Sequence, residues 1–192
     1  MMESDFLDPA ELAQIGFRAI GRGVQVSRHA LFISPDRISL GDQVRIDAFC
    51  ILAAGAREIR IGRNVHFSAY AAVLGREAVE IGDFATVSVR CTIFSSNDDY
   101  TGVAMANATI PTEYRAAVSA PVVLGEHALL GAGCIILPGV TIGESACVGA
   151  LSLVKARVGA FEIVAGVPAR VIGRREAGHR ALAKRLLDQE KG

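Results

Sequence analysis

The sequence has no tryptophan, few aromatic residues, no excess of either charge and no long apolar run. Aromatic residues make up 6% of the chain, and lysine plus arginine equal aspartate plus glutamate at 20 each, so the net charge is zero. A neutral chain is a poor candidate for nucleic-acid binding, which usually needs a basic excess. A membrane-spanning helix needs about 18 or more consecutive apolar residues, and no such stretch occurs, so we expect no membrane partner.

The N-terminus shows no sign of a signal peptide, and the cysteines show no sign of a metal cluster. The first residues, MMESDFLDPAEL, have neither the basic start nor the apolar run of a signal peptide, so we expect a cytoplasmic protein with reduced thiols. The four cysteines show no CxxC spacing, which argues against a metal cluster. Core packing is the favoured role of Cys50, Cys91 and Cys134, and a nucleophilic cysteine is the alternative.

The sequence does contain a repeat of six residues. Five rows each begin with leucine or isoleucine and then glycine, and have a small or β-branched fifth residue: LGDQVR, IGRNVH, IGDFAT, LGEHAL and IGESAC. Their first residues are separated by 21, 20, 43 and 18 positions, so the last separation is one turn of three hexads and the others are one turn plus an insertion. The period predicts a parallel β-helix whose coils stack about 4.8 Å apart. An amphipathic helix would show a 3.6-residue period instead.

This pattern resembles the hexapeptide-repeat acyltransferases over residues 24–173, most sharply in residues 120–175 with their AGVPARVI segment. Within that family it is most similar to the sugar acetyltransferases, which include galactoside and maltose O-acetyltransferases and enzymes that acetylate nucleotide-linked amino sugars. The resemblance implies an all-β fold, a left-handed parallel β-helix of hexapeptide repeats with short N- and C-terminal helices. It also implies acetyl-CoA as the acyl donor, no metal, and a homotrimer.

The chain divides on this basis into three segments. We expect an N-terminal helix and lead-in over residues 1–37, the β-helix over 38–173 with a loop insertion at 95–123, and a C-terminal helix over 174–192. The segment DPAELAQIGFRAIG, residues 8–21, begins with an Asp-Pro helix-start signal. Both terminal helices are expected to cap open ends of the coil, because exposed strand edges invite aggregation. Substrate contacts are the alternative role.

Side chains at the sixth position of each hexad should point outward. In the second hexads this column is largely apolar: Ile51, Ala72, Thr92, Ile135 and Leu153. An apolar outward column suggests subunit contact, so we expect a trimer with active sites between neighbouring subunits. The same reasoning places His66 on the outside of the coil.

The insertion begins with IFSSNDDYTG, where the repeat stops after Ile93. In the relatives this loop crosses to a neighbouring subunit and carries a histidine that acts as general base, but here it has none. The resemblance leaves His66, Asp98 and Asp99 as catalytic candidates and Asn97, Tyr100 and His127 as substrate contacts. An Asx-rich turn that caps its own backbone is the alternative for the acid pair, and a solvated corner is the alternative for His127.

The absence of a histidine from this loop indicates which kind of acceptor group is used. A sugar hydroxyl has a very high pKa and needs a base as attack proceeds, a task that suits histidine near neutral pH. A neutral amine attacks a thioester unaided, and a carboxylate can orient it and later accept its proton. The loop therefore favours an amino sugar, which the resemblance suggests is nucleotide-linked, with O-acetylation of a sugar hydroxyl as the alternative.

The donor side rests on small residues and cations. Thioester transfer needs a backbone N–H near the carbonyl and a slot for the pantetheine arm. The resemblance assigns these cofactor contacts to Leu129, Gly131, Ala132, Ala150, Lys155, Arg170 and Arg174, the last three near the phosphates of CoA. Leu129 replaces a tryptophan frequent in the family, and a solvated basic surface is the alternative for the three cations.

Two other classes of protein stay open. A β-helix carbonic anhydrase would need three histidines that converge on zinc, and a noncatalytic assembly module would bind no CoA. The sequence does not decide which sugar is modified, or whether the acyl group is acetyl, formyl or longer.

Overall fold

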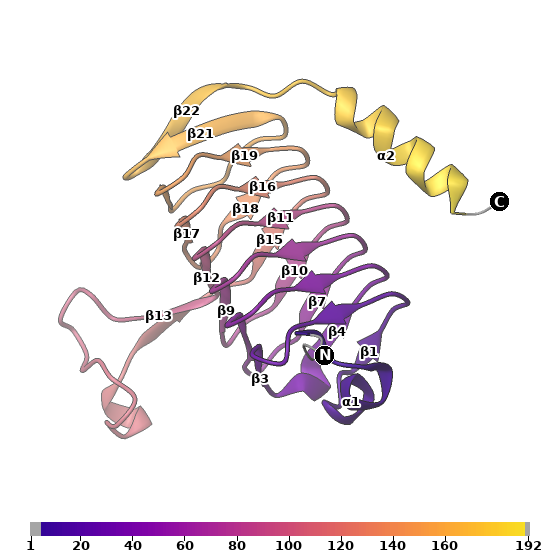
Figure 1. Cartoon of the computed structure of the whole chain (residues 1–192). Coiled ribbons are helices and arrows are strands. Elements are labelled where there is room, and N and C mark those ends of the chain that lie inside the picture. Colours follow the sequence, from indigo (N-terminus) through magenta and orange to yellow (C-terminus); the bar gives the residue numbers. More distant parts are fainter. Residues whose placement is uncertain (1–4, 191–192) are drawn as a thin grey trace.

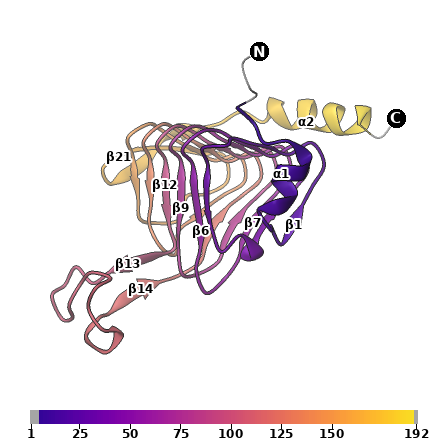
Figure 2. The same ribbon diagram turned by 60° about the horizontal axis from the view of Figure 1, so that its bottom comes forward.

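The computed structural model describes residues 5–190 of the chain, and the outermost parts of the two predicted terminal segments, residues 1–4 and 191–192, lie outside them. The chain winds into about seven coils, and most coils contribute one short strand to each of three parallel sheets (Figures 1 and 2). Seen end-on, the coils enclose a prism with three walls (Figure 2). The predicted parallel β-helix is confirmed.

Each wall of the prism is one sheet. The first sheet contains β1 (Ala19–Ile20), β4 (Ile38–Leu40), β7 (Ile59–Ile61), β10 (Val79–Ile81), β15 (Val122–Leu124) and β18 (Thr141–Ile142). The second contains β2 (Gln25–Val26), β5 (Arg45–Ile46), β8 (His66–Phe67), β11 (Thr86–Val87), β16 (Leu129–Leu130), β19 (Cys147–Val148), β21 (Glu162–Gly166) and β22 (Ala169–Arg174). The third contains β3 (Leu31–Ile33), β6 (Ile51–Ala54), β9 (Ala72–Gly75), β12 (Thr92–Phe94), β17 (Ile135–Ile136) and β20 (Leu153–Val154).

Three edges join these walls. We call the edge between the first and second sheets the first edge, that between the second and third the second edge, and that between the third and first the third edge. At the first and second edges the chain turns through residues with left-handed backbone, among them Phe84 (φ 60°) and His127 (φ 58°) at the first edge and Tyr70 (φ 63°) at the second. Bulky residues rarely adopt this conformation. The regular coil therefore imposes it at most turns of these two edges.

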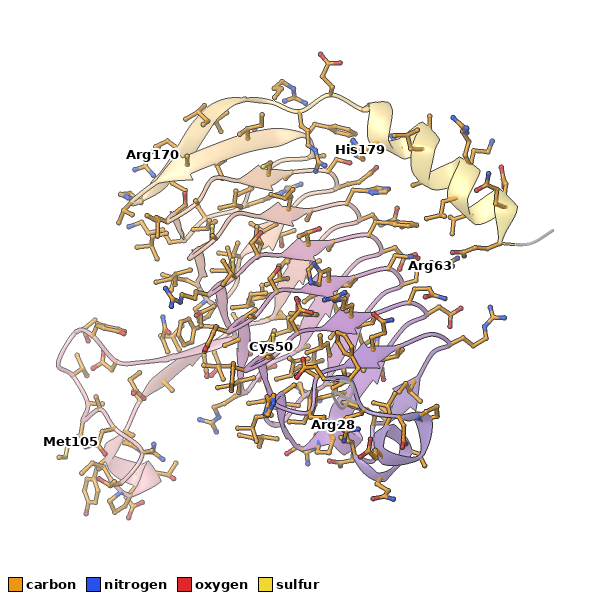
Figure 3. The ribbon with its side chains drawn as sticks, in the orientation of Figure 1. Arg28, Cys50, Arg63, Met105, Arg170 and His179 are labelled. Carbon is orange, nitrogen blue, oxygen red and sulfur yellow. The ribbon has the colours of Figure 1, made fainter. Side chains whose placement is uncertain are left out.

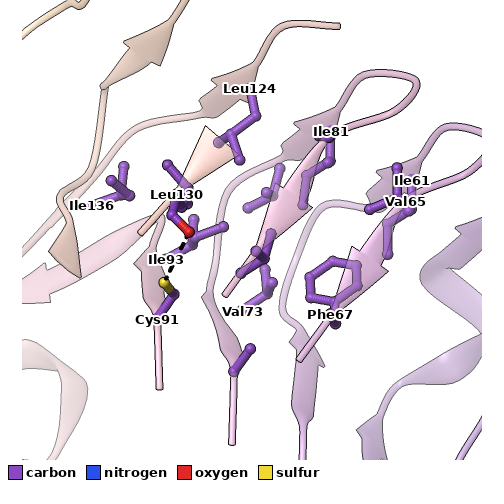
Figure 4. Close-up of a cluster of buried hydrophobic side chains, with 14 of the residues drawn as sticks. Ile61, Val65, Phe67, Val73, Ile81, Cys91, Ile93, Leu124, Leu130 and Ile136 are labelled. Carbon is purple, nitrogen blue, oxygen red and sulfur yellow. Dashed lines mark hydrogen bonds between the residues drawn. The ribbon is translucent and has the colours of Figure 1, made fainter. Parts of the chain in front are cut away.

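Inward side chains fill the prism. The first residues of the hexads, such as Ile81 and Ile142, are buried, and the small fifth residues, such as Ala85 and Ala128, are completely enclosed. Figure 4 shows part of this core around Phe67. Position-two glycines keep adjacent coils close, because a Cβ on Gly125 would lie 2.6 Å from the backbone nitrogen of Glu144.

The cysteines at the inward fifth position are core residues, as predicted. Cys50, Cys91 and Cys134 are fully buried, whereas Cys147 is half-buried. The thiol of Cys50 donates to the carbonyl oxygen of Ser68 in the next coil at 3.1 Å. Burial raises the pKa of Cys50 to about 11, which keeps this thiol protonated and weakly nucleophilic.

The N-terminal helix α1 (Pro9–Gln14) is shorter than the predicted 8–21. Asp8 accepts hydrogen bonds from the backbone N–H groups of Ala10 and Glu11, and Glu11 accepts one from Asp8, which forms a capping box. Leu12 and Phe17 pack against the core, so this segment covers the N-terminal end of the prism (Figure 2).

The C-terminal helix α2 (Gly178–Gln189) lies in a different place from the one expected. It runs beside the first edge, where Arg180 pairs with Glu144 and Arg63 pairs with Glu190 (Figures 1 and 3). The antiparallel strands β21 and β22 lie at the C-terminal end of the coil instead (Figure 1). The expectation that α2 caps that end is therefore wrong. Its polar and charged side chains find partners on the flank of the prism.

Candidate functional site

The insertion is a β-hairpin that leaves the prism at the third edge. Strands β13 (Ser96–Asp98) and β14 (Ala117–Ser119) pair antiparallel, and the short 3-10 helix η2 (Thr112–Tyr114) lies in the loop beyond them. Buried Ser95 anchors the base: its hydroxyl donates to the carbonyl oxygen of Glu77 at 2.8 Å, and its own carbonyl oxygen accepts from Ala120 at 3.1 Å. Figure 3 shows the far end of the hairpin, around Met105, well away from the coils.

The hairpin and the third sheet enclose a cavity of about 700 Å³. Asn97, Asp98 and Tyr100 line this cavity together with Arg115, which lies just before β14. Its floor includes the outward side chains Ile135 and Leu153. A smaller cavity of about 290 Å³ adjoins the hairpin, and its lining includes Asp99 and Val118.

The two neighbouring carboxylates differ in their surroundings. Asp99 accepts hydrogen bonds from the Thr101 N–H at 2.8 Å, the Thr101 hydroxyl at 2.7 Å and the Ala104 N–H at 2.9 Å. The hydroxyl of Thr101 first, and then these backbone N–H groups, lower the pKa of Asp99 to about 2. Asp98 is exposed, and its carboxylate forms no hydrogen bond or ion pair among residues 5–190, although its backbone pairs with Ala117 in the hairpin. Asp99 therefore holds the loop, and Asp98 is free to meet a ligand.

His66 faces outward on the second sheet, between Arg45 and Thr86 of the adjacent coils. Its Nε2 lies 2.8 Å from Oδ2 of Asp47, whose Oδ1 accepts from Nε of Arg45 at 2.7 Å. Burial would raise the pKa of Asp47, but the hydrogen bonds from Arg45 and His66 outweigh it and hold that pKa below its usual range. Asp47 therefore orients His66. Within one chain, His66 lies on a different wall from the hairpin.

His127 lies at the first edge, away from the hairpin at the third. Its ring stacks on Phe84 with centroids 4.9 Å apart and meets the ring of His179 edge-on at 4.9 Å. Burial, followed by the nearby His179 and Arg175, lowers the pKa of His127. The structure thus places His127 beneath the start of α2 rather than at a solvated corner, and does not bring it to Asn97 and Tyr100 in the same chain.

The residues expected to hold the pantetheine arm gather near the second edge. A Cβ on Gly131 would lie 2.7 Å from the backbone nitrogen of Ala150, so these two residues are in close contact across adjacent coils. Ala132 accepts a backbone hydrogen bond from Leu151 at 2.8 Å, and Leu151 is 75% exposed. Leu129 lies in the outward column of the second sheet, between Thr86 and Cys147.

The three expected phosphate-binding cations are not gathered at one point. Lys155 and Arg170 line the same cavity of about 230 Å³ at the C-terminal end of the coil. Arg174 pairs in the strand ladder with Glu162, whereas Arg170 pairs with Ala165 nearer the second edge (Figure 3). Lys155 also borders the small cavity that Asp98 and Asp99 line. It is therefore the only one of the predicted cofactor residues shown to share a cavity with the hairpin within residues 5–190.

One residue at the second edge was not among the sequence-based candidates. Ser88 occupies the same position of its hexad as Gly131 and Gly149, and its N–H donates to the carbonyl oxygen of Leu130 at 3.1 Å. It is half-buried, and no hydrogen bond of its hydroxyl is found within the described part of the chain. A hydroxyl in a column that continues as glycine was the signal available in the sequence.

Residues 5–190 hold no group of three histidine, cysteine or acidic side chains placed to bind a metal ion. The zinc-enzyme alternative therefore lacks its converging ligands there. Neither of the two helices within this range has the length and apolar character that a membrane crossing requires.

Known proteins resemble this chain over most of its length. The family model bacterial transferase hexapeptide (six repeats) matches residues 121–156. The dTDP-4-amino-4,6-dideoxy-D-glucose acyltransferase of Escherichia coli is 40% identical over 185 residues, which cover 96% of this chain and 93% of that protein. The putative lipopolysaccharide biosynthesis O-acetyl transferase WbbJ of Escherichia coli (strain K12) is 38% identical over 68 residues, 35% of each chain.

Solved structures of AntD, an N-acyltransferase from Bacillus cereus, also match closely. Its complex with dTDP and 3-hydroxybutyryl-CoA has a TM-score of 0.94 and 38% identity, over 98% of this chain and 100% of that one. Other AntD structures contain dTDP-4-amino-4,6-dideoxyglucose and coenzyme A. They include variants of a serine and of an aspartate ten positions after it. A hexapeptide-repeat acetyltransferase from Vibrio cholerae O1 biovar eltor, at 21% identity and a TM-score of 0.61, shares the fold.

Proposed function

Because the chain belongs to the hexapeptide-repeat acyltransferases that include the Escherichia coli dTDP-4-amino-4,6-dideoxy-D-glucose acyltransferase, we propose that it acylates the amine of that nucleotide sugar or a close analogue. The observation that carries this proposal is 40% identity over nearly the whole of both chains. The loop without a histidine, which favours an amine over a hydroxyl, supports it from the chemistry.

The acyl donor is a coenzyme A thioester. Acetyl was the expectation from sequence, but AntD is seen with 3-hydroxybutyryl-CoA. We therefore propose a short acyl group, with acetyl and 3-hydroxybutyryl as the two donors to compare.

Two residues are proposed to act on the amine. Only one serine of this sequence has an aspartate ten positions after it: Ser88, which is followed by Asp98. The same spacing separates the serine and the aspartate that were varied in AntD. Asp98 would hold the ammonium form of the acceptor and take up the proton that the nitrogen releases. The hydroxyl of Ser88 would orient the nitrogen. His66 lies on the second sheet, one coil before Ser88, and is oriented by Asp47. It remains a second proposed contact of the acceptor.

The reaction needs no covalent enzyme intermediate. The neutral amine attacks the thioester carbonyl, the carbon–sulfur bond breaks, the nitrogen loses one proton and the thiolate of coenzyme A gains one. The developing oxyanion needs a backbone N–H. The N–H of Gly131 already donates to the carbonyl oxygen of Val148 at 2.8 Å, so the exposed Ala150 is the proposed donor of the two. Lys155 and Arg170 are proposed to bind the phosphates of coenzyme A, with Arg174 further along β22.

We also propose that the working unit is a homotrimer. In one chain Ser88 lies at the second edge and Asp98 projects from the third, so the two lie at opposite edges of the third sheet. A hairpin that reaches across to the next subunit would unite them. The outward side chains of the third sheet support this packing, because Leu31 and Ile135 are 53% and 40% exposed.

The test is a transfer assay with purified protein. We expect release of the coenzyme A thiol, and a product heavier by one acyl group, when dTDP-4-amino-4,6-dideoxyglucose is supplied with acetyl-CoA or 3-hydroxybutyryl-CoA. The matched control is the nucleotide sugar that carries a hydroxyl in place of the amine. Turnover of the hydroxyl compound at a similar rate would favour the O-acyltransferase alternative, and no binding of coenzyme A would favour an assembly module.

A further inference from the structure

Two arginine side chains in the cavity beneath the hairpin have no partner. Arg76 and Arg115 both line it, and no hydrogen bond or ion pair of either side chain is found among residues 5–190. The Nε of Arg115 is buried and unsatisfied. An unpaired buried N–H of a charged group is costly. By contrast, Arg57, next to this region, pairs with Glu77 at 4.0 Å.

The two arginines approach the cavity from different sides. Arg115 lies on the returning side of the hairpin, just before β14, and Arg76 lies at the third edge, directly after β9. Gly75, the residue before Arg76, packs directly against Ser95, which anchors the hairpin. An anion in the cavity would therefore meet one cation from the prism and one from the hairpin.

Asp98 lies on the same face of the hairpin as Arg115. Asp98 is opposite Ala117 in the ladder, Arg115 precedes Ala117 by two residues, and both Asp98 and Arg115 line the cavity. The two side chains form no ion pair with each other. One face thus offers a carboxylate and a guanidinium that remain separate, and a nucleotide-linked amino sugar carries the complementary charges at the two ends of its sugar ring.

We infer that Arg76 and Arg115 bind the diphosphate of the nucleotide-sugar acceptor, an inference that rests on the proposed function. Guanidinium groups donate two parallel hydrogen bonds to phosphate oxygens. With the diphosphate held there, the sugar ring extends towards Asp98, where its amine is bound. The phosphates of coenzyme A have separate cations at the C-terminal end, where Lys155 and Arg170 share a cavity.

Titration calorimetry with three ligands tests the inference. Arg76→Gln and Arg115→Gln should each raise the Kd of dTDP about 10- to 100-fold, the size expected for a charged hydrogen bond. The Kd of thymidine, which lacks the phosphates, and that of coenzyme A should not change. Arg57→Gln is the matched control at the same edge, because that side chain is 70% exposed and does not line the cavity.

Each of the other possible outcomes contradicts a specific part of the inference or of the proposed function. If the variants raise the Kd of thymidine and of dTDP equally, or if Arg57→Gln has the same effect, the two arginines do not bind the diphosphate. If the Kd of coenzyme A rises instead, the cavity serves the donor. If the unaltered protein binds coenzyme A but not dTDP, the proposed acceptor itself is wrong. If dTDP binds equally well to all variants, only the arginine assignment fails.

Discussion

At the scale of single residues, the adjacent acids of the loop have separate tasks. Asp99 is committed to three hydrogen bonds within its own turn, as the Asx-turn alternative anticipated. Asp98 lines the larger cavity, and its carboxylate has no partner among residues 5–190. The hydrogen bonds of the turn therefore distinguish a structural carboxylate from one that can take part in chemistry.

We expect Asp98→Asn to reduce kcat/KM for the amino-sugar acceptor about 100-fold, since a positioned proton acceptor contributes about that much. Its melting temperature should not change, because the side chain is exposed and unpartnered. Steady-state kinetics and a thermal melt check both parts. Asp188→Asn, on α2, is the control and should keep full activity. Full activity of Asp98→Asn would assign the proton to another group.

At the scale of secondary-structure elements, neighbouring coils are held at strand spacing by glycines. We expect Gly125→Ala to destabilise the protein by about 1–3 kcal/mol, because the new methyl would meet backbone atoms of the next coil. Gly178→Ala should cause no loss, because nothing lies within 4 Å of its Cβ position. Urea unfolding of both variants at one protein concentration measures the difference. Equal midpoints would show that the coils can separate to admit a methyl group.

The docking of α2 should depend on pH. Burial first, and then Arg175, lowers the pKa of His179, and burial also lowers that of His127. Both rings are therefore favoured as neutral groups in the docked state. Their contribution is fully present above the ordinary histidine pKa of about 6.5 and is lost as the pH falls through the lowered values.

Hydrogen exchange of α2, corrected for intrinsic rates, checks this expectation. Protection should be highest above pH about 6.5 and should decline in acid. His179→Gln is the matched control, because glutamine can still bond to Ser145, which now lies 2.8 Å from Nε2 of His179, without acquiring a charge. Its α2 should lose protection less steeply. Protection that is independent of pH would mean that the ion pairs with Glu144 and Arg63 alone hold the helix.

The sequence predicted the coils better than the segments attached to them. The hexad IGRGVQ at Ile20 fits the same pattern as the five aligned rows, and β1 pairs with β4 accordingly, yet the expected helix over 8–21 obscured it. The contact of His127 with Phe84 and His179 joins residues far apart in the chain. No periodicity reports such a contact, and the same holds for the pairing of Asn97 with Val118.

At the scale of the whole molecule, a single chain leaves its candidate groups dispersed. His66 and Ser88 belong to the second sheet and second edge, whereas Asp98 and Lys155 lie towards the third edge. The sequence could nominate most of these groups from family resemblance. It could not reveal their separation, because that depends on which wall each hexad enters and on the direction of the hairpin.

We expect Ile135→Arg to dissociate the assembly. Ile135 is an apolar, 40% exposed side chain on the outward face of the third sheet, where a buried charge would be costly. Light scattering should change from three times the 20.2 kDa chain mass towards the single-chain value. Leu182→Arg, on α2, is the control, since that leucine is equally apolar and 63% exposed. A chain that is already monomeric without substitution would contradict the trimer.

The coils before and after the hairpin pair with each other directly. β10 pairs directly with β15 and β12 with β17, although the hairpin separates the members of each pair in sequence. The hairpin therefore leaves the prism without interrupting the sheets on either side of it. Exchange of residues 96–119 for the corresponding piece of another member leaves the buried anchor Ser95 in place. It should alter which sugar is accepted while the thermal stability of the prism stays the same.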